Sequence, residues 1–265
     1  MRTLLIIIAL FCFSLTGESQ GLLDGFLKGK NNLDLAFSAF HQTSNQFYAG
    51  VSKVKLTRNI FSIGAFGAYG ITNKWDVVLN LPLINGQLQD AAIGTKYELI
   101  KTKLFGKQLS ILPSITFSTP LSNYNTENSQ AVGQKATVIS PRLIVQQNLP
   151  FGLFIQLQSG YNYALSPVTS SVPFSTKLGG SFGKLYVDFW YDYQKGFGNK
   201  DYSGAVPYSS FRELVVNHNR VGGVFYYTLK EKTGVFFNYS YTINGRNTSQ
   251  ALGLGAGVVF KLKTK

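Results

Sequence analysis

Cysteine, histidine and charge are scarce in this 265-residue sequence. Its one cysteine, Cys12, lies in the N-terminal apolar run, so neither disulfides nor thiolate metal sites are expected in a mature chain that has lost that run. The two histidines, His41 and His218, offer little for a transition-metal centre, and we expect no metal and no cofactor. Charged residues make up 14% of the chain, whereas soluble domains carry about a quarter.

Apolar runs long enough to form a membrane helix, which needs about 20 residues, are also missing. The run at residues 4–13 follows the basic Arg2 and precedes small residues up to Ser19. A positive start, a short apolar stretch and small residues behind it are typical of a secretory signal. We therefore expect a signal peptide over 1–19, cleaved between Ser19 and Gln20.

Alternation of apolar and polar residues is the main pattern that the sequence does contain. Over 185–193 one face carries Leu185, Val187, Phe189, Tyr191 and Tyr193, and the other carries Tyr186, Asp188, Trp190 and Asp192. The same period of two recurs over 109–117 and 234–242, in stretches of about ten residues, the length of a tilted membrane strand. Together with 14% aromatic residues, this pattern predicts an all-β fold, a transmembrane antiparallel up-and-down β-barrel of about 12 strands.

The predicted strands and their connections follow a regular order. The strands are expected at 33–40, 60–71, 74–83, 91–101, 108–119, 137–148, 153–164, 173–182, 185–194, 218–229, 234–242 and 251–262. Connections after even strands are short, and those after odd strands tend to be long, above all 41–58, 120–135 and 195–217. Outer-membrane barrels have short periplasmic turns and long external loops. We therefore expect a periplasmic N-terminal segment over 20–30 and an outer-membrane barrel over 31–265.

A soluble β-sandwich is the main alternative, because it also alternates apolar and polar positions. The aromatic residues near strand ends and the ionisable residues on the opposite faces favour the barrel. The net charge of +13 comes largely from lysines at the predicted periplasmic rim, where they can meet lipid phosphates, although lysines also populate ordinary turns. Lipid and lipopolysaccharide are the expected partners, and no nucleic acid is expected.

Several segments resemble a known group of proteins. Residues 29–33, 46–50, 66–72, 75–82 and 88–97 resemble outer-membrane barrels of Bacteroidetes-type bacteria. More loosely, they are similar to the barrel family named for the MetA pathway of phenol degradation. The resemblance implies a transporter for small, hydrophobic molecules and assembly by the barrel-assembly machinery.

The C-terminus departs from the pattern of such barrels. They usually end on an aromatic residue that the assembly machinery recognises, whereas Phe260 here is followed by five further residues. We expect Phe260 to serve as a slightly inset form of that signal, and the departure weakens the case for recognition by the assembly machinery.

Nine ionisable residues fall on the inward-facing parity of the predicted strands. They are Asp34, Asp76, Lys96, Glu98, Arg142, Lys177, Asp188, Asp192 and Arg220. Lys or Arg facing lipid at mid-depth would cost roughly 2–4 kcal/mol, so a lumen-facing position is expected. Because the charges nearly balance, we favour ion pairs that fill a narrow interior; a charged path that selects permeants is the alternative.

The loop over 195–217 is the candidate for an external lid or ligand-contact loop, through Phe197, Tyr202, Tyr208 and Phe211. An aromatic surface loop at the lipopolysaccharide boundary is equally compatible with these residues. Transport of small molecules is the favoured function. A structural or adhesive barrel that acts through its external loops is the alternative.

A lipid-modifying enzyme built on His218 is a third hypothesis. A serine hydrolase needs a serine beside the imidazole, and Ser209 or Ser210 could supply one. Neither serine has a recognisable nucleophile setting, so no catalytic residue and no enzyme activity are expected.

Overall fold

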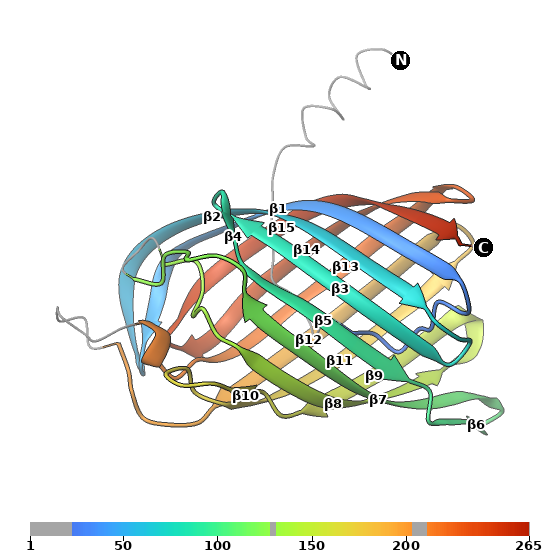
Figure 1. Ribbon diagram of the computed structural model, residues 1–265, viewed down its shortest axis with the longest axis horizontal. Coiled ribbons are helices and arrows are strands. Elements are labelled where there is room, and N and C mark those ends of the chain that lie inside the picture. The colour runs from blue at the N-terminus through green and yellow to red at the C-terminus, as the bar shows by residue number, and fades with distance from the viewer. Residues whose placement is uncertain (1–22, 128–130, 203–210, 265) are drawn as a thin grey trace, which may run out of the picture.

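The structure of the protein, a computed structural model, describes residues 23–127, 131–202 and 211–264. In these residues twelve long strands form a single closed barrel (Figure 1). They are β1 (Asn32–Ala49), β2 (Ser52–Gly70), β3 (Trp75–Ile84), β5 (Asp90–Tyr97), β7 (Lys107–Pro120), β8 (Val138–Asn148), β9 (Leu153–Gly160), β11 (Ser171–Phe182), β12 (Leu185–Gly196), β13 (Asn217–Lys230), β14 (Thr233–Arg246) and β15 (Thr248–Lys263). No helix among the described residues is long and apolar enough to cross a membrane.

Every long strand pairs antiparallel with its sequence neighbours, and the first and last strands pair with each other. Phe37 of β1 lies opposite Val258 of β15 and also opposite Ala65 of β2. The ring is continuous because β7 pairs with both β5 and β8. An up-and-down barrel leaves no open sheet edge around its circumference. The predicted fold, an all-β barrel of twelve antiparallel strands, is confirmed.

Three short strands and two 3₁₀ turns complete the described elements. They are β4 (Gln87–Leu88), β6 (Ile100–Leu104), β10 (Tyr163–Ala164), η2 (Pro150–Gly152) and η3 (Phe211–Glu213). β6 pairs with the start of β7 and forms a hairpin that projects beyond one end of the barrel (Figure 1).

The alternation seen in the sequence separates the outer surface of the barrel from its interior. In β12, Phe189 is 51% exposed, whereas its neighbours Asp188 and Trp190 are buried. Large apolar side chains are exposed in the same way around the wall, among them Ile63, Leu79, Ile93, Ile115, Leu143, Leu157, Leu178, Phe225, Phe237 and Leu254. An apolar outer surface with a polar interior is the arrangement of a barrel surrounded by lipid.

The two ends of the barrel differ in their connections. At the end named here the short-turn end, the strands are joined through residues 71–74, 98–106, 149–152, 183–184 and 231–232. At the opposite end, named the loop end, the strands are joined by tight turns at 50–51, 85–86 and 247 and by longer connections at 121–137, 161–170 and 197–216. Both ends of the barrel sequence, Asn32 and Lys263, are paired at the short-turn end.

The predicted long loop over 41–58 is wrong. β1 and β2 continue as a paired hairpin from Ser44 to Ala49, and Gly50, with φ +60°, allows the tight turn at its tip. Backbone pairing extends β1 through residues 41–46, although all of them are polar. Two smaller boundary errors also appear, because β5 ends at Tyr97 instead of residue 101 and β9 ends at Gly160 instead of residue 164.

Candidate functional site: the barrel interior

Residues 23–30 lie inside the short-turn end of the barrel, which corrects their separation from the barrel as a periplasmic segment over 20–30. Leu23 is buried against a cluster of inward-facing apolar side chains that includes Val78 and Leu112. Phe26 packs edge-on against Phe154, with ring centroids 4.8 Å apart. The segment thus occupies interior space and belongs to the barrel core. Residues 1–22, with the predicted signal peptide, lie outside the described residues.

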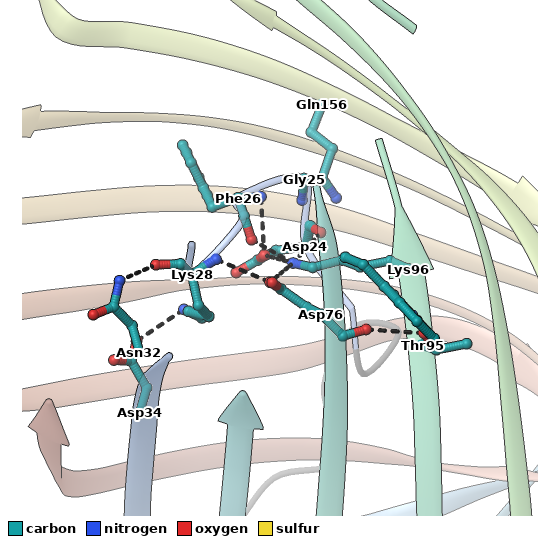
Figure 2. A network of polar contacts seen from close by, with 11 residues as sticks. Asp24, Gly25, Phe26, Lys28, Asn32, Asp34, Asp76, Thr95, Lys96 and Gln156 are labelled. Atoms are coloured by element: carbon teal, nitrogen blue, oxygen red, sulfur yellow. Dashed lines mark hydrogen bonds and ion pairs between the residues drawn. The ribbon is translucent and has the colours of Figure 1, made fainter. Parts of the chain in front are cut away.

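Lys96 holds this segment through three oxygen atoms (Figure 2). Its Nζ donates to Asp24 Oδ1 at 2.7 Å, to the Asp24 carbonyl at 2.9 Å and to the Phe26 carbonyl. Asp76 Oδ2 lies 3.6 Å from the same Nζ and accepts a hydrogen bond from the Lys28 amide at 3.0 Å. The side chains of Lys96 and Asp76 are 2% and 0% exposed, and charges this deeply buried are stable only when they are paired.

Two further contacts tie the segment to the wall. Lys28 Nζ forms an ion pair with Asp34 Oδ2 of β1 at 2.9 Å, and the Gly25 amide donates to Gln156 Oε1 of β9 at 2.8 Å (Figure 2). Asp24 and Lys28 were not among the predicted inward residues, because inward positions were predicted only within strands. The charges that flank the apolar residues of 23–27 were the available signal.

The main cavity, of about 900 Å³, fills the middle of the barrel. Six of the nine predicted inward residues line it: Asp34, Arg142, Lys177, Asp188, Asp192 and Arg220. The other three, Asp76, Lys96 and Glu98, are buried but are not among its lining residues; Glu98 accepts a hydrogen bond from Ser110 at 2.9 Å.

Most charges in the main cavity are paired across the strands. Lys177 Nζ lies 3.2 Å from Asp188 Oδ2, which also accepts a hydrogen bond from Tyr186 Oη at 2.7 Å. Asp192 Oδ2 lies 2.7 Å from Arg220 Nη2 and 3.0 Å from His218 Nε2. The interior therefore has both features weighed from the sequence: ion pairs, and a charged surface that lines open space.

At the loop end, residues 131–137 and 211–216 lie against each other. The side-chain Nε2 of Gln134 donates to the backbone carbonyls of Phe211 (3.3 Å) and Leu214 (3.1 Å). In return, Arg212 Nε donates to the backbone carbonyl of Gln134 (3.0 Å). A smaller cavity of about 410 Å³ lies beneath these segments. It shares lining residues with the main cavity, including Ile84, His218 and Arg220, so the two spaces adjoin.

The four aromatic residues singled out in the 195–217 loop separate into different environments. Tyr202 and Phe211 stack on each other, with ring centroids 5.5 Å apart, and both contact the fully buried Phe47 of β1. Phe197 instead lies on Tyr161 and is 44% exposed. Tyr208 lies outside the described residues.

An ion pair outside the barrel wall fastens the 197–216 segment to the tip of β14. Arg246 binds Asp201 with Nε to Oδ1 at 2.5 Å and Nη2 to Oδ2 at 2.9 Å, the paired geometry that favours arginine over lysine. The hydrogen bond from Arg246 lowers the pKa of the Asp201 carboxyl below its ordinary value. Asn247 adds a hydrogen bond from its side-chain nitrogen to Asp201 Oδ1 at 2.8 Å.

The surroundings of His218 are those of an ion-paired wall residue. Its Nε2 contacts Asp192, and no serine of the described residues forms a hydrogen bond with it. Ser209 and Ser210, the two candidate nucleophiles, lie outside the described residues. Within the described parts of the chain, no group of three or more His, Cys, Asp or Glu residues is arranged to hold a metal ion.

Comparison with known proteins finds the likeness in fold rather than in sequence. No family model matches the chain, and no curated protein matches it. Among solved structures, the COG4313 outer membrane channel from Pseudomonas putida F1 is similar at a TM-score of 0.66 and 12% identity, over 90% of this chain and 99% of that one. The NanC porin (0.59, 12%; 86% and 100%) and the KdgM porin (0.54, 9%; 85% and 98%) are also similar.

At these identities the likeness establishes the fold, an outer-membrane-type β-barrel of the kind found in channels and porins. The resemblance to the MetA-pathway family and to Bacteroidetes-type barrels has no support in these comparisons and stays a prediction.

Proposed function

We propose that this chain is an outer-membrane channel for small molecules. The observation that carries the proposal is the pair of adjoining cavities inside a closed barrel whose outer surface is apolar. Water-filled space lined by charge is what a solute needs to cross a bilayer, and an apolar wall is what the bilayer needs to hold the barrel. The channel and porin structures of similar fold support the same function. Lipid and lipopolysaccharide around the wall, and cleavage after Ser19, belong to this proposal.

The channel is proposed to be closed in the described conformation and to open by displacement of its end segments. Residues 23–30 occupy the short-turn end, and the described parts of 121–137 and 197–216 pack together at the loop end. Conduction then depends on how often the contacts of Lys96 or of Gln134 break. The charged main cavity and the partly apolar smaller cavity favour solutes that carry a polar group on an apolar body.

Planar-bilayer conductance and liposome uptake test the proposal. The wild-type mature protein is expected to show infrequent openings, and a variant lacking residues 23–30 is expected to conduct steadily. A variant lacking 197–216 separates closure at the loop end from closure at the short-turn end. If neither deletion, alone or combined, gives conductance or uptake in a correctly folded barrel, the channel function is excluded. A structural barrel that acts through its external loops then becomes the better explanation.

A further inference from the structure

Arg58 of β2 lines the smaller cavity and has no ionic partner. Among the described residues, no carboxylate forms an ion pair with its guanidinium. Its Nη2 donates to the Ala131 carbonyl, its Nη1 has only a 3.5 Å contact with Ser249 Oγ, and its Nε is buried with no hydrogen-bond partner. A guanidinium has five N–H donors and cannot lose its charge in a protein, so a buried one normally has a carboxylate beside it. Arg58 therefore has unused capacity for an anion.

The other described charges of the smaller cavity do not pair with Arg58. Asp90 lines the same cavity, but it accepts a hydrogen bond from Tyr124 Oη at 2.6 Å and forms no ion pair with Arg58. Arg220 and His218 on the inner side both bind Asp192. Asp90 therefore balances Arg58 in formal charge without forming an ion pair with it, so the guanidinium keeps its donors for one anionic group, and the carboxylate makes the cavity unfavourable for a ligand with several negative charges.

Much of the remaining wall is apolar. Ile84, Tyr124 and Val132 form a buried cluster with Ile60 packed against it, and Phe47 lines the cavity from β1. The volume of about 410 Å³ falls within the range of small-molecule sites, roughly 300–1,000 Å³. A guanidinium with free donors, next to an apolar part of the cavity wall, fits a ligand with one anionic group and one apolar body.

We propose that the smaller cavity binds a small organic acid, with its carboxylate on Arg58 and its apolar body against Phe47, Ile60 and Ile84. This inference rests on the proposed channel function and specifies its solute class. The carboxylate completes the hydrogen bonding of the guanidinium, and the apolar wall excludes water from the contact, which strengthens it. Inorganic anions lack the apolar body, and neutral analogues lack the charge, so both should bind more weakly.

Isothermal titration of the mature protein in detergent tests this directly, with benzoate as the probe. Benzamide is the neutral compound of the same shape, and phosphate is an anion without an apolar body. We expect saturable benzoate binding at one site, and affinities at least tenfold weaker for both comparison compounds. Equal affinity for benzoate and benzamide, or for benzoate and phosphate, would overturn the proposal without any variant.

The variant Arg58→Gln tests whether benzoate binds at Arg58. It should weaken benzoate binding at least tenfold and leave the weak benzamide binding unchanged. Arg58→Lys keeps the charge and should restore part of the affinity. Lys55→Gln is the matched control, because it removes an exposed positive charge from the same strand outside the cavity. Unchanged benzoate binding in folded Arg58→Gln would refute the assignment.

The binding measurement needs no membrane, so it separates the two proposals. Binding that depends on Arg58, in a barrel that never conducts, would remove the channel function and keep the site. Conductance without benzoate binding would keep the channel function and remove the proposed site.

Discussion

Lys96 Nζ lies 2.7 Å from Asp24 Oδ1, although 72 residues separate them in the chain. Asp24 belongs to the segment inside the short-turn end, and Lys96 belongs to the wall strand β5. The same lysine lies near Asp76, the most deeply buried carboxylate of the group. A single side chain therefore both neutralises the wall and holds the segment that occupies the interior. This double role makes Lys96 the point at which stability and gating should be coupled.

Lys96→Met should increase conductance and lower stability together. Removing the cation leaves Asp24 without its main tie and Asp76 buried without its nearby cation, and breaking one side of a buried pair costs about 3–5 kcal/mol. Single-channel recording should show more frequent openings, and denaturant unfolding in liposomes should shift to lower concentrations. Lys101→Met is the control, because the Lys101 side chain is 55% exposed and lies 3.7 Å from Glu98, which also accepts a hydrogen bond from Ser110. If Lys96→Met opened as rarely as the wild type and unfolded at the same denaturant concentration, Lys96 would not be what holds residues 23–30 in the barrel.

Gly70→Ala should displace the same segment by steric conflict alone. A Cβ at Gly70 would lie 2.0 Å from the carbonyl oxygen of Gly29, a backbone atom that cannot rotate away. The segment must move, so conductance should rise and a protease should reach residues 23–30 more readily. Gly67→Ala on the same strand is the control, since a Cβ there meets only Leu35 Cδ2, at 3.5 Å. Equal behaviour of the two variants would mean that the close approach of Gly29 to β2 does not persist in the membrane.

The sequence predicted the wall of the barrel better than its interior, for a physical reason. In β12 the lipid-facing Phe189 and the inward Asp188 have opposite solvation requirements, so their order alone indicates the strand and its faces. Residues 41–46 are all polar, so no apolar alternation marks this part of β1, which backbone pairing with β15 and β2 nonetheless extends. The position of Asp24 depends on Lys96, a long-range pairing that a local pattern does not contain.

The aromatic residues of the 195–217 loop are likewise placed by long-range contacts. Tyr202, Phe211 and Phe197 are all aromatic residues of one polar loop, and nothing local distinguishes them. Phe47, from a distant strand, determines which two turn inward.

Phe189→Lys should destabilise the barrel if its outer surface meets lipid. A lysine near the bilayer midplane costs about 2–4 kcal/mol. Phe189 lies in the middle of β12 and is half exposed, whereas Phe151 is almost fully exposed in the short turn before β9, so Phe151→Lys should cost little. Unfolding in liposomes measures both changes, and heat-modifiable gel mobility reports the folded fraction. A negligible effect of Phe189→Lys would show that this surface is in water and would remove the membrane assignment with it.

Loss of the Asp201–Arg246 ion pair in acid should make the 197–216 segment more accessible to proteases. Because the hydrogen bond from Arg246 lowers the pKa of Asp201, the folded form binds its proton less readily than the unfolded chain does. The stabilisation is therefore fully present above the unfolded value, about 3.9, and is lost as the pH falls through the lower folded value. The side chains of Arg246 and Asp201 are 26% and 35% exposed, so solvent weakens the pair and the effect should be small. Cleavage within 197–216 should be slow at pH 7 in the wild type and faster in Asp201→Asn, and the two rates should converge as the pH falls below the folded pKa of Asp201. Since every other carboxylate is shared by the two proteins, a difference that persisted in acid would assign the protection to something other than the charge of Asp201.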